Sequence, residues 1–453
     1  MSDTFVAQST PVGVSALALI RASGPLCVEI ANDLHSGSQK EGPKSRHAYF
    51  GRLHDLEGNL IDEVVWIFYS QDSSYTGEPM LEIMPHGNPL ICKIIIDDFC
   101  KRGCRLAEPG EFTQRAYLNG KLNFSQVEGV LDVIHAQSDR ALFYARKHLS
   151  GESGRAIKGM VREMTSIRAE IEAYIDFPED ELPPEDAEGP LQKLKTIIDT
   201  LDRFQATAKN RETVQNGLNT LIVGAPNAGK SSLLNALLGH NRALVSSTAG
   251  TTRDYIVEST FVGDHLVNLF DTAGLTTVPS GDLESEGIHR TLDLMERAEF
   301  FLIVVDSTEE PPQLPEALIS KITAANSLVV ENKIDLPDSR THERYLPHIR
   351  HVHISTFDRS MLNDLQTCWN ILIDEELNIR DEDGMMFNLR QAEFLRNSME
   401  ELKHAQRILK ESSATELAAF HLIQASEELV KINEHIDNES VLDDLFNRFC
   451  IGK

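Results

Sequence analysis

The sequence lacks any apolar stretch long enough to cross a membrane as a helix, which takes roughly 20 residues. Its longest apolar runs are of the kind VVWIF. The first residues, MSDTFVAQSTP, carry an acid where a secretory signal peptide carries bases. We therefore expect a cytoplasmic protein with no membrane partner.

Cysteine is scarce as well. The chain has six, at positions 27, 92, 100, 104, 368 and 450, and none has the CxxC spacing of a zinc ribbon or a redox site. Cys100 and Cys104, in CKRGC, are close in sequence and are expected to be reduced thiols or core residues. This usage favours a reducing compartment over a secreted, disulfide-built fold.

Basic residues are outnumbered. The chain has 43 Lys and Arg against 70 Asp and Glu, which gives a formal net charge of -27. Such a surface repels phosphate backbones over most of its area. Any contact with nucleic acid must therefore be made by a local patch.

Four segments differ in hydrophobic pattern, and a chain of this length predicts about two to four domains. Residues 1–120 mix short apolar runs with turns, which predicts a small α+β domain. Residues 121–215 and 378–453 have helical periodicity, whereas residues 216–377 alternate short apolar strands with helical stretches. The last pattern is typical of a mostly parallel, doubly wound α/β sheet. We infer one discontinuous helical domain interrupted by an inserted α/β domain.

Individual elements follow from the same patterns. TLIVG, LVNLFDTAG, FFLIVVDST and SLVVENKID are expected to be strands of the inserted domain. SGESG (150–154) is expected to separate two helices. The second of these is long and amphipathic, because its apolar residues recur every three or four positions, at Ile157, Met160, Val161, Met164, Ile167, Ile171 and Tyr174.

A phosphate-binding loop opens the inserted domain. GAPNAGKS, from Gly224 to Ser231, matches GxxxxGK[ST], and it lies between the apolar TLIV and the helical SLLNALLG. In such a loop backbone N–H groups surround the phosphates and Lys230 reaches the β- and γ-phosphate oxygens. Ser231 supplies a hydroxyl ligand to Mg²⁺.

Three further motifs follow in the order of a Ras-like GTPase. TAGTTRD (248–254) offers Thr252 as a second hydroxyl for Mg²⁺. DTAG (271–274) offers Asp271 to the metal through water, and the Gly274 N–H to the γ-phosphate. NKID (332–335) places Asp335 where a carboxylate accepts two N–H bonds from guanine, a donor pair that adenine lacks.

Ser355, in ISTFD, is a weaker fifth element of this site. The predicted GTP-binding residues are Asn227, Ala228, Gly229, Lys230, Ser231, Ser232, Ser246, Ser247, Thr248, Ala249, Gly250, Thr251, Thr252, Asp271, Thr272, Ala273, Gly274, Asn332, Lys333, Ile334, Asp335 and Ser355.

Two residues bear on hydrolysis. Ras-like GTPases carry a glutamine after DTAG to orient the attacking water, but this chain has Leu275, whose apolar side chain cannot do so. Asn227 places an oxygen donor in the phosphate-binding loop, and SSTAGT (246–251) adds hydroxyls and carbonyls. A monovalent cation bound there would supply the charge that an arginine finger supplies elsewhere.

The last five residues are FCIGK. Cys450 stands where a prenylated cysteine would, but Gly452 and Lys453 fit a prenylation box poorly. A frayed end without function is the plainer interpretation. Cys450 is either a small buried apolar residue or a reactive thiol whose thiolate form the neighbouring Lys453 favours.

Asn227, Leu275, the interrupted helical domain and FCIGK together resemble the MnmE (TrmE) family of tRNA-modification GTPases, over essentially the whole chain. SYTGE (74–78), HGN (86–88) and PGEFTQRAYLNGKLN (109–123) are similar to that family's amino-terminal signatures.

The resemblance implies a homodimer formed by folate-binding amino-terminal domains and a potassium-activated G domain. It also implies a heterotetramer with the FAD-binding protein MnmG, which modifies C5 of the wobble uridine of certain tRNAs. The implied cofactors are Mg²⁺, K⁺ and a tetrahydrofolate derivative, in its 5-formyl or methylene form.

The resemblance also assigns residues. The implied folate ligands are Arg21, Glu78, Lys121 and Lys453, and the implied K⁺ ligands are Asn227, Ser246, Thr248 and Thr251. The catalytic glutamate falls on Glu284 in DLESEGI, with Asp282 and Glu286 as alternatives because the loop after Leu275 is one residue longer than usual. Ser246 replaces a threonine, and PVGVSALA replaces a glycine-rich segment.

The chemistry of these residues suits the implied ligand. Glu78 can accept the N–H pair of a pterin ring, and the cations at Arg21, Lys121 and Lys453 can pair with the carboxylates of the folate tail. Cys450 beside a folate could act as nucleophile or proton carrier, or could only pack.

Two other functions compete with tRNA modification. A ribosome-assembly GTPase would carry a second G domain or a KH domain, but the chain has one phosphate-binding loop. Its GESG (151–154) lies between helices and is not a KH loop. A regulatory switch without modification chemistry would not need the folate-like charges or an ordered tail.

Overall fold

The structure, a computed structural model, describes residues 3–35, 42–176, 188–241, 257–271, 294–377, 385–411, 415–433 and 439–453. The chain divides into two compact units, each described here by itself. The first, the N-terminal unit, comprises Met1–Leu131, Leu149–Gly154 and Val430–Lys453. The second, the G-helical unit, comprises Asp132–His148 and Arg155–Leu429.

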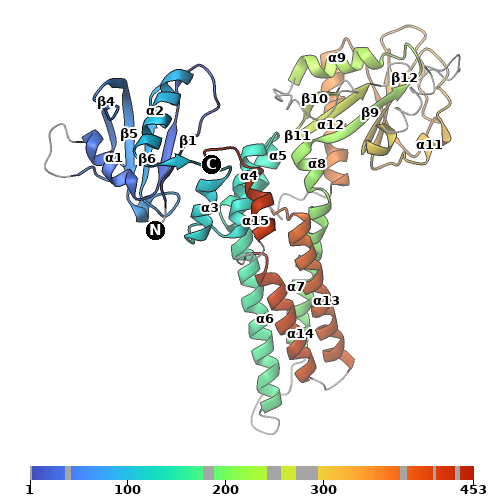
Figure 1. The fold of residues 1–453 in the computed structure, drawn as a ribbon. Coiled ribbons are helices and arrows are strands. Elements are labelled where there is room, and N and C mark those ends of the chain that lie inside the picture. Colours follow the sequence, from blue (N-terminus) through green and yellow to red (C-terminus); the bar gives the residue numbers. More distant parts are fainter. Residues whose placement is uncertain are drawn as a thin grey trace. The chain divides into compact units, whose positions relative to one another are not determined.

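The N-terminal unit is built on a six-stranded sheet of order β4-β5-β6-β3-β1-β8, in which β1 and β8 are the parallel pair (Figure 1). In β5, Val64 and Trp66 are buried and Val65 between them is less so, because successive side chains of a strand point to opposite faces. Two helices, α1 and α2, contribute Cys27, Ile30, Ile95 and Phe99 to the core on this sheet.

The elements of the N-terminal unit are β1 (Phe5–Gln8), β2 (Ser15–Leu17), β3 (Ile20–Ser23), α1 (Leu26–His35), β4 (Ala48–His54), β5 (Leu60–Tyr69), the 3₁₀ helix η1 (Gln71–Ser73), β6 (Met80–Met84), β7 (His86–Gly87), α2 (Pro89–Lys101), β8 (Arg105–Leu106), α3 (Glu111–Leu118), the first part of α4 (Phe124–His135) and α15 (Glu439–Phe446).

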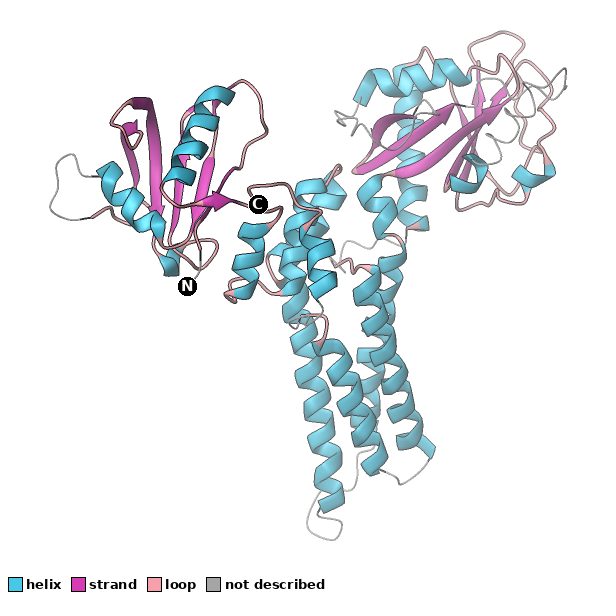
Figure 2. Ribbon diagram, viewed as in Figure 1, coloured by secondary structure: helices cyan, strands magenta, loops and turns pink. Residues whose placement is uncertain are grey.

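The G-helical unit contains the second sheet, of order β10-β11-β9-β12-β13-β14 (Figure 2). All neighbouring strands are parallel except β10 and β11, which form an antiparallel pair at one edge. Every residue of β12, FFLIVVD, is buried, as expected for a central strand covered on both faces. One face packs on α9 and α12 through residues such as Leu233 and Trp369, and the other packs on Leu318 of α11.

The elements of this unit are α5 (Asp139–Leu149), α6 (Glu152–Asp176), α7 (Glu188–Lys209), α8 (Arg211–Asn216), β9 (Leu218–Gly224), α9 (Lys230–Asn241), β10 (Val257–Val262), β11 (His265–Asp271), β12 (Phe300–Asp306), α11 (Glu316–Ile319), β13 (Ser327–Asn332), β14 (Arg350–His353), α12 (Arg359–Glu376), α13 (Leu389–Glu411) and α14 (Thr415–Val430).

The long predicted helix is α6, whose buried residues include Ile157, Met164 and Ile167. SGESG interrupts the helices over fewer residues than predicted, because α5 ends at Leu149 and α6 already begins at Glu152. Helix α7 precedes the strands of the second sheet in the sequence and α13 follows them, yet the two helices pack side by side (Figure 1). None of the described helices combines the length and apolarity that a membrane crossing requires.

The predicted fold class is therefore confirmed: an α+β region, an interrupted set of helices and an inserted P-loop α/β domain. Helix α5 joins the inserted domain to the helices, since its Ala141 and Tyr144 lie in the same core as Val262, Trp369 and Met386. The exact division at residues 120, 215 and 377 remains a prediction.

Candidate functional site

The phosphate-binding loop connects the carboxyl end of β9 to the start of α9. Gly224 and Gly229 both have positive φ, 156° and 98°. A Cβ atom would lie 2.2 Å from the Val304 carbonyl oxygen at Gly224 and 2.1 Å from Asn332 Nδ2 at Gly229. Only glycine permits this close approach, so the loop's shape depends on its glycine spacing.

Lys230 is the first residue of α9 and is 9% exposed. Its ammonium group donates hydrogen bonds to the carbonyl oxygens of Gly224 and Ala225, at 2.9 and 2.8 Å. These bonds place the cation over the loop, where phosphate oxygens would bind.

Asn332 holds three loops together at the carboxyl ends of the parallel strands. The side chain is 1% exposed. The side-chain Nδ2 of Asn332 donates to the Ala228 carbonyl at 3.0 Å, and its Oδ1 accepts from the Thr356 N–H at 3.3 Å. The backbone carbonyl of Asn332 accepts from the Ser307 N–H at 2.9 Å. The predicted NKID and ISTFD motifs therefore meet the phosphate-binding loop at one edge of the sheet, the edge where α/β folds bind ligands.

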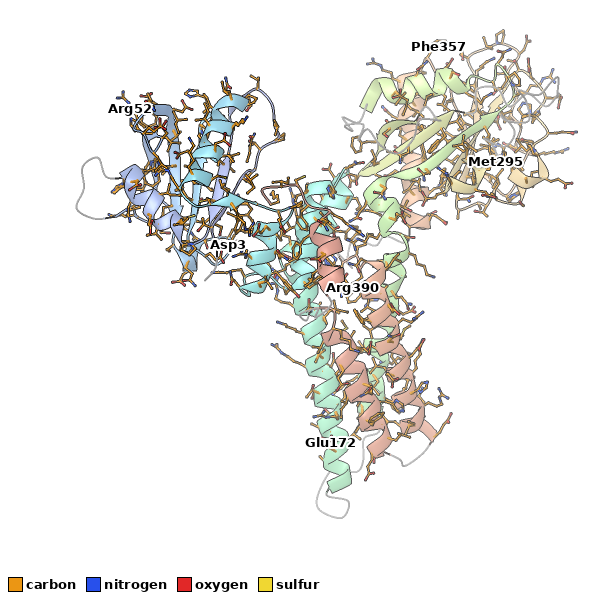
Figure 3. All side chains as sticks on the ribbon, in the orientation of Figure 1. Asp3, Arg52, Glu172, Met295, Phe357 and Arg390 are labelled. Carbon is orange, nitrogen blue, oxygen red and sulfur yellow. The ribbon has the colours of Figure 1, made fainter. Side chains whose placement is uncertain are left out.

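The neighbouring Lys333 has a positive φ of 67° and forms an ion pair with Asp306 at 2.5 Å. Burial opposes ionisation of Asp306, but hydrogen bonds from Lys333 and from the N–H and hydroxyl of Thr308 lower its pKa. This network fixes the start of the loop that presents Asp335, whose side chain is exposed. Phe357, in the ISTFD loop, is 89% exposed (Figure 3).

Several predicted nucleotide-site residues lie outside the described residues. They are Ser246, Ser247, Thr248, Ala249, Gly250, Thr251, Thr252, Thr272, Ala273, Gly274, Leu275, Asp282, Glu284 and Glu286. Asp271 ends β11 and is paired in register with Ile222 of β9. The members whose side chains are described are Asn227 to Ser232, Asn332 to Asp335, and Ser355.

Two of these described members suit the predicted cations. Asn227 has a positive φ of 64° and is exposed, and its side chain has no hydrogen-bond partner among the described residues, so its amide oxygen can coordinate a cation. Ser231, at the second position of α9, carries a hydroxyl at the helix end where phosphates and their Mg²⁺ bind.

The second candidate site lies in the N-terminal unit, where the FCIGK tail is ordered. Phe446 and Phe449 are each 4% exposed, and their rings are 5.9 Å apart. Ile451 forms an antiparallel bridge with Pro109, and the Lys453 backbone oxygen accepts from the Phe112 N–H at 3.2 Å. The interpretation of a frayed end is therefore wrong.

Gly452 makes the closest contacts of the tail. Its carbonyl oxygen accepts hydrogen bonds from the Ser9 hydroxyl at 2.9 Å and from Arg21 Nη1 at 3.3 Å. Its φ is 94°, and a Cβ atom would lie 2.7 Å from the Gln8 carbonyl oxygen. Ile451 is 57% exposed, because its bridge to Pro109 uses the backbone and not the side chain.

The tail lies beside predicted folate residues. Arg21 forms an ion pair with Glu82 at 2.7 Å in addition to its bond to the tail. Ser23, two residues along the same strand and so on the same face, donates to Glu78 at 3.2 Å. The Lys121 ammonium group donates to the Asp72 backbone carbonyl. Its side chain also passes close to Gly77, the residue before Glu78, because a Cβ atom added to Gly77 would lie 3.4 Å from Lys121 Cε.

Sequence reasoning missed a cation that holds Glu78. Arg115 donates to Glu78 at 2.9 Å, to Asp3 at 2.7 Å and to Glu111 at 3.2 Å. Hydrogen bonds from Arg105 and Arg115 lower the pKa of Asp3 to about 2. The signal was present, because Arg115 and Glu111 both lie in the PGEFTQRAYLNGKLN signature.

Cys450 and Lys453 are exposed. The tail thus brings a thiol and a cation to the region of Arg21. Glu78 and Arg115 form an ion pair, and Glu78 also bonds to Ser23 at the end of the strand that carries Arg21. A carboxylate has about four lone-pair sites, so Glu78 can accept further donors while it remains bonded to Arg115.

Comparison with known proteins gives consistent matches. A family model described as the TrmE amino terminus of a GTP-binding protein matches residues 4–121, and one described as the MnmE helical domain matches residues 124–450. The tRNA modification GTPase MnmE of Opitutus terrae is 41% identical over 457 residues, covering 100% of this chain and 99% of the relative.

The proteins of the same description from Aquifex aeolicus and Thermotoga maritima are 35% and 36% identical, each over 100% of both chains. Full-length similarity at this level, together with both family models, shows that the chain belongs to the MnmE family of tRNA modification GTPases.

Proposed function

We propose that this GTPase hydrolyses GTP in a K⁺-dependent manner and that it uses a tetrahydrofolate one-carbon unit, with the FAD-binding partner MnmG, to modify C5 of wobble uridine in tRNA. The observation that carries the nucleotide part is the position of Asn332, which bonds to the phosphate-binding loop and to the ISTFD loop. The residues that we propose to bind phosphate and to read the base are thereby held at one edge of the sheet.

At this edge Lys230 would exchange its two loop carbonyls for phosphate oxygens, and Ser231 would bind Mg²⁺ together with Thr252. Asp335 would accept the two N–H groups of guanine, and Ser355 would support the loop beside it. The Mg²⁺ ion neutralises charge on the phosphates during hydrolysis.

Asp335→Asn is expected to weaken GTP binding at least about tenfold and to improve binding of xanthosine triphosphate. A hydrogen bond to a charged group is worth about 1.5–3 kcal/mol, and the asparagine amide can donate to the extra oxygen of xanthine, which repels a carboxylate. Competition binding with both nucleotides measures the change. An unchanged preference for GTP would remove Asp335 from the base site.

Replacing K⁺ by Na⁺ at equal ionic strength is expected to lower the hydrolysis rate at least about tenfold. Leu275 cannot orient water, and Asn227, Ser246, Thr248 and Thr251 would bind a cation that stabilises the transition state. A tenfold loss corresponds to about 1.4 kcal/mol, a modest value for a missing charge. Equal steady-state rates in the two salts would contradict this prediction.

In the N-terminal unit, Arg21, Lys121 and Lys453 would pair with the carboxylates of a folate, and Glu78 would accept N–H groups of its pterin ring. Arg115 would keep Glu78 oriented, since it donates to this carboxylate directly. A bound folate supplies a one-carbon unit. The tail would present Cys450 near the folate, either as a reactive thiol or as a residue that only packs against the ligand.

Further parts of the proposal rest on the family. They are a homodimer formed by the amino-terminal domains, a heterotetramer with MnmG, and action on tRNA in the cytoplasm. The full-length similarity to proteins described as tRNA modification GTPases supports them.

A regulatory GTPase without modification chemistry is the competing function, and the ordered tail next to Arg21 argues against it. Folate retention separates the two. We expect the purified chain to bind 5-formyltetrahydrofolate and expect Arg21→Ala to bind it at least about tenfold more weakly, since a charge-assisted bond is lost. If equilibrium dialysis detects no folate bound to the wild type, the modification function in this form is wrong.

A further inference from the structure

A basic segment stands out in this acidic chain. Between residues 140 and 162 there are six cations (Arg140, Arg146, Lys147, Arg155, Lys158 and Arg162) and one acid (Glu152), a formal charge of six minus one, or plus five. The whole chain carries -27. A phosphate backbone approaching this protein would therefore be attracted to this segment and repelled elsewhere.

Three of these cations form a stripe on α6. Arg155, Lys158 and Arg162 are three and four residues apart, so they lie on one face of the helix, and all three are exposed. At 1.5 Å rise per residue they are about 4.5 and 6 Å apart along the helix axis. The buried residues Ile157 and Met164 face the core from the other side of α6, so the stripe is not used for packing in its own unit.

Two of the three cations are not neutralised by acids. Lys158 and Arg162 form no ion pair with any residue that the structure describes, whereas Arg168, further along α6, pairs with Glu172 at 3.4 Å. Glu172 lies toward the far end of the helix (Figure 3). The next exposed positions along the face of the stripe are the uncharged Thr165, Ser166 and Ala169.

We propose that the stripe of Arg155, Lys158 and Arg162 binds the phosphate backbone of the tRNA substrate. Closely spaced cations without intervening acids match the charge of a phosphodiester chain, and such contacts hold RNA in position without reading its sequence. The inference rests on the proposed function, which makes tRNA the substrate. It resolves the conflict between a strongly acidic chain and an RNA substrate.

The test replaces all three residues by glutamine in the full-length chain, because glutamine has nearly the helix propensity of arginine and lysine. We expect the dissociation constant for tRNA to rise at least about tenfold. Each lost phosphate contact reduces the slope of log K against log salt by about 0.7–0.9, so the loss of three contacts should make the slope shallower by about two to three units.

A matched control exists on α13, where Lys403, Arg407 and Lys410 are exposed with spacings of four and three. There Glu400 and Glu411 lie one turn away on the same face and neutralise part of the charge. The Lys403→Gln, Arg407→Gln, Lys410→Gln variant loses the same three charges, and we expect its tRNA affinity to remain within about twofold of the wild type.

Both variants should hydrolyse GTP at the wild-type rate, which shows that they fold. The proposal would be overturned if the wild type and the α6 variant had equal tRNA affinity and equal slopes of log K against log salt. This comparison holds whatever the absolute affinity of the wild type is. The proposal would also be overturned if the α6 variant bound tRNA normally but no longer bound an acidic protein partner. In that case the stripe would be a protein-binding surface. Neither outcome would contradict the proposed modification, which is measured on cellular tRNA.

Discussion

Glu284→Ala is expected to lower the turnover of GTP hydrolysis by about a hundredfold or more while it leaves the affinity for GTP nearly unchanged. Leu275 occupies the position of the water-orienting glutamine, so another polar side chain must do this work. A residue that positions or deprotonates water acts mainly in the transition state, and such groups contribute about 10²–10⁴-fold. Single-turnover rates and nucleotide titration separate the two effects.

Asp282→Ala and Glu286→Ala are the matched controls, since both acids lie two residues from Glu284 in the same loop. Each control should keep at least about half of the wild-type turnover. Normal hydrolysis by Glu284→Ala together with a large loss in one control would assign the catalytic role to that neighbour.

Deletion of residues 450–453 is expected to abolish modification of tRNA and to weaken folate binding, with GTP hydrolysis within about twofold of the wild type. The deleted residues include the Gly452 carbonyl, which bonds to Arg21 and Ser9. The contacts of this tail with Ser9, Arg21, Pro109 and Phe112 all lie in the N-terminal unit. The phosphate-binding loop lies in the G-helical unit. Nucleoside analysis, folate dialysis and a phosphate-release assay measure the three effects.

Two point variants refine the result. Gly452→Ala should act like the deletion. The φ of 94° at this position disfavours alanine, and the added Cβ would lie only 2.7 Å from the Gln8 carbonyl oxygen, so the tail could not keep its contacts with Ser9 and Arg21. Cys450→Ser keeps the backbone contacts, so it should retain folate and lose modification if the thiol is reactive. Wild-type modification in the deletion strain would show that the tail is dispensable.

The inserted domain was predictable because its signals are local. The run FFLIVVDST predicted a strand, and β12 is a strand that is buried at every residue. The glycine spacing of GAPNAGKS predicted the phosphate-binding loop, and the close approaches at Gly224 and Gly229 explain that spacing. The long α6 followed from a repeat of three and four residues in the same way.

The contacts of the N-terminal unit were not predictable, because they join residues far apart in sequence. Nothing local in FCIGK indicates that Gly452 bonds to Ser9, or that Ile451 stays exposed while Phe449 is buried. Arg115 similarly reaches Glu78 from a different element. Such pairs are fixed by the tertiary fold, and a single sequence shows only that suitable residue types exist.

Mass spectrometry of nucleosides from the tRNA of cells that lack this gene examines the proposed function itself. We predict that the aminomethyl or carboxymethylaminomethyl group at C5 of the wobble uridine disappears. The full-length gene should restore it, whereas a gene lacking codons 450–453 should not. Undiminished modification in cells without the gene would contradict the proposal that this GTPase carries out the reaction.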